Sequence, residues 1–319
     1  MESLKKRIVV IGGVAAGPKA ASRARRLDQS AEITLIQREQ DLSMASCGYP
    51  YYVGGWFNDR NQLLSAPTGA VRNPGFFQNV KNITALVNTE AESIDRAAHT
   101  VACRNLDTGE MRVVEYDKLV IATGAKAVVP PIPGVQLEGI TTLQSMRDTD
   151  YLRRACENGK GTKAVIVGGG LIGVEAAEAL TKSGIDVTLV EMLPQILSFL
   201  DVDLSMLAAN HMRAKGVDVR TGDGVTEFLG EDGRVTSVRL ASGVELACGL
   251  VVLAVGVRPN TQLAAKAGLA LGARGGIQVD EYLQTSDPDI YAAGDCIEIP
   301  HRLTGKPVLA PLGDLANLE

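Results

Sequence analysis

The 319-residue sequence predicts an α/β fold built from two similar domains, each with a parallel sheet and a small antiparallel meander. Two observations predict it. A short apolar strand followed at once by a glycine-rich turn and a helical pattern occurs twice, near residues 7–27 and 163–183. Each of these stretches leads into alternating sequence punctuated by turn residues, as expected of antiparallel strands. The length leaves enough material for two hydrophobic cores.

The composition argues against several classes of protein. A net charge of -5 and only 4% aromatic residues argue against a nucleic-acid partner. The charged N-terminus is not a secretory signal, and no apolar run approaches the ~20 residues of a membrane span. Five cysteines without C-x-x-C spacing and three scattered histidines predict neither a disulfide framework nor a metal site. We therefore expect a cytoplasmic protein.

The first domain begins with the apolar strand Arg7–Ile11, the glycine-rich turn 12–17, a helix and a second strand over 32–37. This order is typical of a Rossmann-like, dinucleotide-binding unit. Val14 stands where G-x-G-x-x-G has its second glycine, and Gln37 replaces the usual acid at the end of the second strand. An ordinary tight strand-to-helix turn is therefore the alternative interpretation.

The second copy follows the pattern more closely. Strand Lys163–Val167 leads into residues 168–173, which match G-x-G-x-x-G, then into a helix over Val174–Ser183 and a strand over Asp186–Val190 that ends in Glu191. The glycines let a pyrophosphate approach the start of the helix, where free N–H groups favour anions. A carboxylate at the strand end binds ribose hydroxyls and repels a 2′-phosphate, which favours NADH over NADPH.

Turn signals place the antiparallel meanders at Ile83–Tyr116 and Val217–Leu246. Each meander ends in an apolar strand closed by glycine, at 119–124 and at 250–256. The Pro-rich stretch 128–134 predicts a stiff linker. Farther along, residues 275–284 read as extended sequence. The chain therefore looks like two nucleotide-binding domains of one design.

The segment Ser43–Tyr52 holds a single cysteine, Cys47, with no second cysteine four or five residues away. Small residues precede it, and a glycine, a proline and three tyrosines follow. This loop-like setting predicts a thiol that performs redox chemistry by itself. Three other cysteines are expected to be structural: Cys103, Cys156 and Cys248. Cys296 follows Asp295 directly; packing is the favoured interpretation, and proximity to a cofactor the alternative.

The order of these motifs resembles that of the FAD-dependent pyridine nucleotide–disulfide oxidoreductases over essentially the whole chain. The resemblance rests on both glycine-rich turns, on A-T-G at 122–124 and on A-G-D at 293–295. It implies an FAD-binding domain from residues 1–125 and 250–319, and an NAD(H)-binding domain from residues 126–249.

The motif S-x-x-x-C-G-x-P-Y-Y at 43–52 resembles the single-cysteine branch of that family. The branch includes coenzyme A-disulfide reductases, NADH-dependent persulfide or polysulfide reductases, and NADH oxidases and peroxidases. Members extend beyond this length into a C-terminal dimerisation domain, which is absent here. The resemblance therefore implies a homodimer for the full-length protein and a catalytic role for Cys47.

Cofactor-binding residues follow from the glycine-rich turns, the strand ends and the resemblance. They are Gly12, Val14, Ala15, Ala16, Gly17, Gln37, Arg38, Ser46, Ala122, Thr123, Gly124, Gly168, Gly170, Leu171, Ile172, Gly173, Glu175, Glu191, Gly256, Gly294 and Asp295.

Substrate-binding residues are expected on the first helix, where Lys19, Arg23 and Arg26 share one face. Family members that use coenzyme A place basic side chains of this helix against its phosphates. The resemblance adds Lys81 as a further basic position and Ser43 near the pantetheine arm. A solvated basic helix face is the alternative interpretation.

The expected function is FAD-dependent, NADH-driven reduction of coenzyme A disulfide, or of coenzyme A persulfide or polysulfide, through Cys47. Two alternatives stay open. One is an NADH oxidase or peroxidase in which Cys47 cycles through a sulfenic acid. The other is a non-catalytic flavoprotein that senses NADH or carries electrons.

Overall fold

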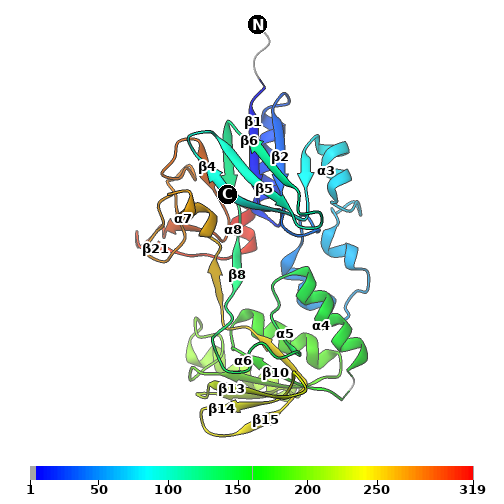
Figure 1. The fold of residues 1–319 in the computed structure, drawn as a ribbon. Helices are drawn as coiled ribbons and strands as arrows, with labels where there is room; N and C mark the ends of the chain where they lie inside the picture. Colours follow the sequence, from blue (N-terminus) through cyan, green and yellow to red (C-terminus); the bar gives the residue numbers. More distant parts are fainter. Residues whose placement is uncertain (1–4, 160, 319) are drawn as a thin grey trace. The chain divides into compact units, whose positions relative to one another are not determined.

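The computed structural model describes residues 5–159 and 161–318, which form two compact units (Figure 1). Unit 1 comprises the described residues up to Ser46, then Asn61–Lys126, and those from Pro259 on. Unit 2 comprises Cys47–Arg60 and Ala127–Arg258. The return to unit 1 was expected at residue 250, and this boundary is wrong. The strand Leu250–Leu253 belongs to the sheet of unit 2, because it pairs with the strand Lys163–Val167.

The core of unit 1 is a five-stranded parallel sheet in the order β19-β7-β1-β2-β3. Its strands are β1 Arg7–Ile11, β2 Glu32–Ile36, β3 Thr84–Leu86, β7 Lys118–Ile121 and β19 Ile290–Ala292. The expected first strand is therefore confirmed. Central strands of such a sheet are buried on both faces, which explains the continuous apolar run of β1.

Successive side chains of β1 pack into different hydrophobic cores. Val10 packs with residues of α1 (Ala16–Leu27) and α3 (Pro74–Lys81) on one face. Val9 and Ile11 face the opposite way, into the cluster that includes Val101, Tyr116 and Leu269. The alternation follows from the two-residue period of a strand.

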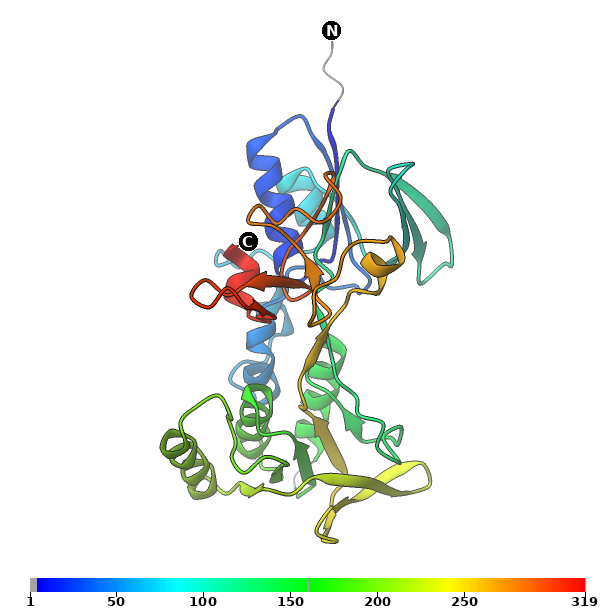
Figure 2. The same cartoon turned by 90° about the vertical axis from the view of Figure 1, so that its left-hand side faces the viewer.

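The antiparallel meander of unit 1 consists of β4 (Thr89–Asp95), β5 (Thr100–Asn105) and β6 (Met111–Glu115), which lie side by side in Figure 2. The expected start of this meander at Ile83 is wrong. The residues just after Ile83 form β3, which extends the parallel sheet beside β2.

Unit 2 repeats the design with the parallel order β12-β11-β10-β16-β9. Its strands are β9 Ile140–Thr141, β10 Lys163–Val167, β11 Asp186–Glu191, β12 Asp218–Thr221 and β16 Leu250–Leu253. The meander is formed by β13 Val225–Glu231, β14 Arg234–Leu240 and β15 Glu245–Ala247. The expected meander start at Val217 is wrong for the same reason as in unit 1, because β12 pairs in parallel with β11.

Three longer helices belong to unit 2: α4 Met146–Asn158, α5 Leu171–Lys182 and α6 Val202–Ala214. A capping box starts α4, in which the Ser145 side chain accepts from Asp148 N and the Asp148 side chain accepts from Ser145 N. The sequence predicted the α5 helix from Val174, but it starts at Leu171. The short helix α2 (Tyr49–Val53) packs against α4 and α5.

The remaining elements are short. They are the 3₁₀ turns Ser46–Gly48 and Arg60–Leu64, the paired strands β8 Ala125–Ala127 and β17 Val257–Pro259, α7 Gln262–Lys266, β18 Ile277–Gln278, β20 Ile297–Pro300, β21 Pro307–Val308 and α8 Gly313–Leu318. The extended stretch expected at 275–284 is reduced to β18, because the Asp280 side chain accepts from Tyr282 N and Gln284 N and closes a turn. None of the described helices is long and apolar enough to cross a membrane.

Candidate functional site

In the first glycine-rich turn, two glycines are required by the packing of strand against helix. Gly12 has φ +112°, and a Cβ on it would lie 1.9 Å from the carbonyl oxygen of Ala122. A Cβ on Gly17 would lie 1.8 Å from the oxygen of Gly12. Val14, at the position of the missing glycine, is 37% exposed. The turn thus brings α1 close to β1 and β7 and presents Val14 to solvent.

The second turn has the same geometry. A Cβ on Gly168, at φ +109°, would lie 2.4 Å from the oxygen of Ala254, and one on Gly173 would lie 2.0 Å from the oxygen of Gly168. Gly170 is different, because its φ is -76° and a Cβ there would meet no atom within 4 Å. The fold does not require a glycine at this point. The open space at the start of α5 therefore fits a bound pyrophosphate.

The side chains at the ends of β2 and β11 hold the two turns in the same way. Gln37 Oε1 accepts from Gly13 N at 2.9 Å, and its Nε2 donates to the oxygen of Asp41. Glu191 Oε2 accepts from Gly169 N at 2.6 Å, and Oε1 accepts from Leu193 N at 2.8 Å. Because each carboxylate oxygen has a second lone pair, Glu191 keeps acceptor capacity for ribose hydroxyls.

Asp295 stands just after β19, the edge strand of the unit 1 sheet. Burial raises the pKa of its carboxyl, and within the described chain no hydrogen bond or ion pair to the side chain is found. A half-buried carboxylate without a partner is costly unless a ligand supplies a donor. The hydroxyl groups of a bound flavin nucleotide fit this position.

The A-T-G motif is fixed by Asn260. Thr123 Oγ1 donates to the oxygen of Asn260 at 2.6 Å, and Asn260 Nδ2 donates to the oxygen of Thr123 at 3.0 Å. Asn260 N donates to the oxygen of Gly124, which has φ +63°. The sequence did not single out Asn260 for this contact. In unit 2, the oxygen of Gly256 accepts from Val128 N in the linker.

Cys47 is exposed and lies in the 3₁₀ turn Ser46–Gly48 just before α2, whereas the other four cysteines are buried. Burial raises the pKa of Cys103 and of Cys248 to about 11, and it also raises the pKa of Cys156 and Cys296. Buried thiols of this kind are inert. The structural role expected of Cys103, Cys156 and Cys248 agrees with their burial, and so does the packing role favoured for Cys296.

Ser43 marks a second correspondence between the two units. Its backbone has φ +54°, and its N–H donates to the oxygen of Gly13 at 2.6 Å. Leu197 has φ +46°, and its N–H donates to the oxygen of Gly169. Cys47 lies four residues after Ser43, and Asp201, just before α6, lies four residues after Leu197. Cys47 and Asp201 therefore occupy corresponding positions in the two units.

The basic residues expected to bind substrate divide into two groups. Arg26 and Lys81 line a cavity of about 270 Å³ between α1 and α3, whereas Lys19 and Arg23 are exposed on α1 and do not line it. The full lining is Ser22, Arg25, Arg26, Gln29, Val80, Lys81 and Asn82.

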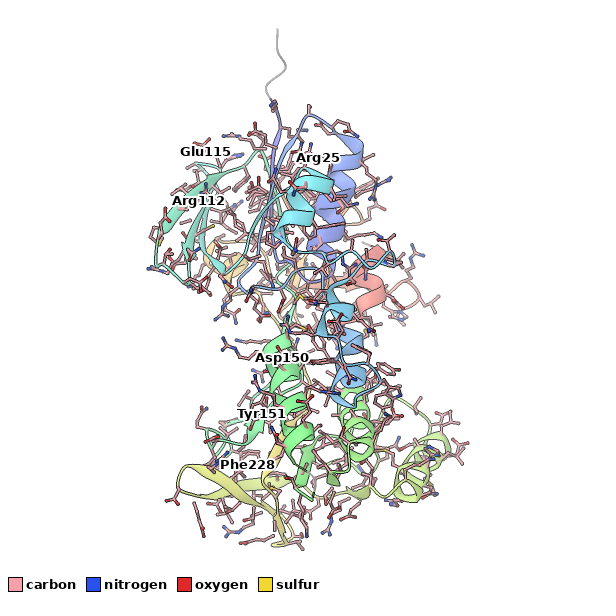
Figure 3. The ribbon with its side chains drawn as sticks, turned by 90° about the vertical axis from the view of Figure 1, so that its right-hand side faces the viewer. Arg25, Arg112, Glu115, Asp150, Tyr151 and Phe228 are labelled. Carbon is pink, nitrogen blue, oxygen red and sulfur yellow. The ribbon has the colours of Figure 1, made fainter. Side chains whose placement is uncertain are left out.

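The sequence did not predict Arg25, which is 8% exposed and lies beside α3 in Figure 3. Its Nη atoms donate to the carbonyl oxygens of Asp28, Gln29 and Asn82, and its Nε has no partner in the described chain. A buried guanidinium without a carboxylate leaves this cavity positively charged and suited to an anion.

The other predicted cofactor residues occupy varied settings. Arg38 forms an ion pair with Glu90 at 3.5 Å. Ser46 is exposed beside Cys47, and Leu171 is 55% exposed at the start of α5. Partial desolvation, followed by the nearby Glu178, raises the pKa of Glu175. Three of the remaining predicted positions lie at the glycine-rich turns: Ala15, Ala16 and Ile172. Gly294, with φ +79°, lies after β19 and directly precedes Asp295.

No group of three or more metal-ligating side chains occurs within residues 5–159 and 161–318. Unit 1 thus contains one glycine-rich turn and the basic cavity, and unit 2 contains the second glycine-rich turn and the exposed thiol of Cys47.

A family model described as pyridine nucleotide-disulphide oxidoreductase matches residues 6–311. The structure is similar to that of a NAD-dependent persulfide reductase from A. fulgidus, with 44% identity and a TM-score of 0.95 over 98% of this chain. An NADH oxidase from Methanocaldococcus jannaschii is 33% identical over 97% of this chain. A NAD(P)H coenzyme A polysulfide/persulfide reductase from Pyrococcus horikoshii is 35% identical over 99%. The chain spans 57%, 67% and 68% of the lengths of these three proteins.

Proposed function

Because the chain belongs to the pyridine nucleotide-disulphide oxidoreductase family, we propose that it is an NADH-dependent reductase of coenzyme A disulfide or coenzyme A persulfide. The family is FAD- and NAD(H)-dependent, as the sequence motifs predicted. The observation that carries the choice of substrate is the basic cavity beside α1, lined by Arg26 and Lys81. Coenzyme A presents phosphates that such a cavity binds, whereas oxygen and peroxide present none.

Each cofactor has a part of the chain that fits it. The turn of unit 1 and the unpartnered Asp295 fit FAD, and the open turn at Gly170 with Glu191 fits NADH. When bound, FAD relays the two electrons of NADH to sulfur. A carboxylate at Glu191 disfavours the 2′-phosphate of NADPH, which supports NADH as the donor.

Cys47 performs the sulfur chemistry. Its thiolate attacks one sulfur of coenzyme A disulfide, forms a mixed disulfide and releases one coenzyme A thiolate. The two electrons of NADH then reduce the mixed disulfide, which restores the Cys47 thiolate and releases the second coenzyme A. With coenzyme A persulfide, the Cys47 thiolate attacks the sulfur attached to coenzyme A, forms the same mixed disulfide and releases the terminal sulfur as sulfide. The two electrons of NADH then reduce that mixed disulfide. Exposure of Cys47 is what allows a bulky disulfide to reach it.

The test measures NADH oxidation with coenzyme A disulfide and with pantethine, a disulfide that lacks the adenosine phosphates. Arg26→Ala and Lys81→Ala should each raise the KM for coenzyme A disulfide about tenfold, as expected for a charge-assisted hydrogen bond, and should leave pantethine kinetics unchanged. Arg112→Ala, which removes an exposed basic side chain on β6, is the control. Activity on neither coenzyme A disulfide nor persulfide, or full activity in Cys47→Ser, would refute the proposal.

An NADH oxidase or peroxidase is the second candidate, favoured by the similarity to the Methanocaldococcus jannaschii protein. In that function Cys47 forms a sulfenic acid during turnover. The mass of the peptide that contains Cys47 distinguishes the two. A coenzyme A adduct supports the reductase, and added oxygen supports the oxidase.

The physiological setting follows from the thiols and from the resemblance. All five cysteines are free, which favours a reducing compartment such as the cytoplasm. The resemblance favours a homodimer for the full-length protein, and sedimentation of that protein tests it. Besides NADH and FAD, we propose a small-molecule thiol or disulfide as the partner in the reaction.

A further inference from the structure

The segment that carries Cys47 folds with unit 2 rather than with the sequence that precedes it. Residues Cys47–Arg60 group with Ala127–Arg258, and α2 packs against α4 and α5. Helix α2 has only five residues. A helix this short does not persist without tertiary contacts. The direction of α2, and with it the direction of the preceding thiol, therefore depends on what holds α2 from outside.

Arg153 of α4 makes three contacts with this segment. Its Nη1 donates to the carbonyl oxygen of Tyr52 at 3.0 Å, and its Nη2 donates to Asn58 Oδ1 at 2.7 Å. The guanidinium carbon also lies 5.5 Å from the centroid of the Tyr52 ring. The Arg153 side chain is 16% exposed, and its Nε donates to Glu157 one turn along α4. A single planar cation thus fixes both the last turn of α2 and the loop behind it.

Two glycines allow the chain to come this close. Gly55 has φ +73°, and a Cβ on it would lie 2.9 Å from Arg153 Nη1. A Cβ on Gly54 would lie 2.1 Å from the Trp56 ring and 3.1 Å from Ala179 Cα of α5. The Gly54–Gly55 pair therefore permits the approach of Arg153 on one side and of α5 on the other.

Two further ion contacts support the same segment. Lys182, the last residue of α5, donates from Nζ to the oxygen of Gly54 at 3.3 Å and lies 4.3 Å from the centroid of the Trp56 ring. Arg60 pairs with Asp150 of α4, labelled in Figure 3, at 3.0 Å. The carbonyl oxygens at the end of α2 carry partial negative charge, which both Arg153 and Lys182 stabilise.

We infer that Arg153 is a positioning residue for Cys47: by holding the last turn of α2 to α4, it sets the orientation of the thiol that the proposed reaction uses. The inference rests on the proposed role of Cys47. It assigns no contact with substrate or cofactor to Arg153 itself.

The test compares Arg153→Met, which removes the guanidinium and keeps an apolar stem, with Arg153→Lys, which keeps a donor able to reach Tyr52 O. Arg154→Met is the matched control, since Arg154 is the exposed neighbour on α4. Hydrogen exchange in the peptide 49–58 should be about tenfold faster in Arg153→Met, intermediate in Arg153→Lys and unchanged in Arg154→Met. One lost charge-assisted hydrogen bond corresponds to roughly this factor.

Kinetics separate positioning from a general loss of structure. In Arg153→Met, kcat with coenzyme A disulfide should fall about tenfold, while NADH reduces the flavin at the wild-type rate. Equal losses in flavin reduction and turnover, or unchanged exchange in the peptide 49–58, would overturn the inference. If Arg153→Met does not fold, Arg153→Lys decides by the same two measurements. If the wild type reduces neither coenzyme A disulfide nor coenzyme A persulfide, the proposed function fails, while exchange and flavin reduction still report on Arg153.

Discussion

Desolvation raises the pKa of Cys103 and Cys248 to about 11, so at pH 8 only about one thiol in a thousand at each site is the reactive thiolate. Both are also buried, as are Cys156 and Cys296. Cys47, by contrast, is exposed in the 3₁₀ turn just before α2. Burial therefore separates one accessible thiol from four inaccessible ones.

Alkylation measures this separation directly. In the native protein at pH 8, iodoacetamide should modify one thiol per chain, at Cys47, and modification of the other four should be at least about a hundredfold slower. Peptide mass analysis over time gives both rates. Cys47→Ser should leave a protein that takes up almost no reagent until it is unfolded. Fast modification of Cys296 in the native protein would contradict this assignment.

The buried carboxyl of Asp295 is expected to lower the stability of the fold and to strengthen the binding of FAD. Its pKa is raised by burial, so the unfolded state is the more ionised one between the two pKa values. Stability therefore falls as the pH rises from the unfolded pKa through the folded one, and the full penalty is present above the folded pKa. Asp295→Asn should raise the melting temperature of the flavin-free protein at pH 7 and should have little effect at pH 3.

The same substitution should weaken FAD binding, because an amide is a poorer acceptor for a ribityl hydroxyl than a carboxylate. The flavin content after dialysis, compared with that of Asp289→Asn in the turn before β19, measures this effect. An Asp295→Asn protein that is both less stable and fully flavin-loaded would show that the carboxylate has a structural partner.

At the scale of elements, the two strand–turn–helix units use glycine for two different reasons. Gly17 and Gly173 lie where a Cβ would overlap a carbonyl oxygen of the preceding turn. Gly170 lies where a Cβ would meet nothing. The first kind of glycine is required by the fold, and the second leaves space for a ligand.

This contrast predicts opposite results for two alanine substitutions in one turn. Gly173→Ala should destabilise the protein by more than about 2 kcal/mol, because a buried overlap of this size forces the backbone to move. Gly170→Ala should change the melting temperature little and should raise the Kd for NAD⁺ about tenfold or more. Thermal unfolding and nucleotide titration of both variants provide the check. Comparable stability losses in the two would refute the division.

Most elements could be predicted from periodicity and glycine placement, and the errors have specific physical reasons. Arg7–Ile11 and Lys163–Val167 are continuous apolar runs, and such runs are typical of central parallel strands. β3 and β12 were assigned to the meanders, because a short edge strand has the same alternation whether its neighbour is parallel or antiparallel.

The candidate site could be predicted only where its signal is local. Cys47 and the two turns are contiguous motifs, so the sequence indicates them. Arg25 resembles its neighbours in the sequence, and only the packing of α3 shows that it is the buried cation of the cavity. Arg153 lies about a hundred residues from the segment that it holds, and no pattern in the sequence connects the two.

At the scale of the whole molecule, the chain passes from unit 1 into unit 2 for residues Cys47–Arg60 and then returns to unit 1. The single tryptophan, Trp56, lies in this segment. Trp56 packs against Tyr51 at a centroid distance of 5.4 Å and beneath Lys182 of α5. Its fluorescence therefore reports on unit 2, although the residue is close in sequence to the elements of unit 1. Circular dichroism reports on both units.

This placement predicts which ligand moves the tryptophan signal. NAD⁺ at 100 times its Kd stabilises the unit that binds it by about 2.7 kcal/mol, which corresponds to roughly 1 M urea or more for a unit of this size. The Trp56 fluorescence transition should move to higher urea by that amount in NAD⁺, and at the same NAD⁺ concentration Gly170→Ala should reduce the shift to about half or less. The part of the circular dichroism transition that belongs to unit 1 should stay in place. If NAD⁺ moves only the unit 1 part of the circular dichroism transition, the segment 47–60 folds with unit 1. That result would also exclude the positioning of Cys47 by Arg153.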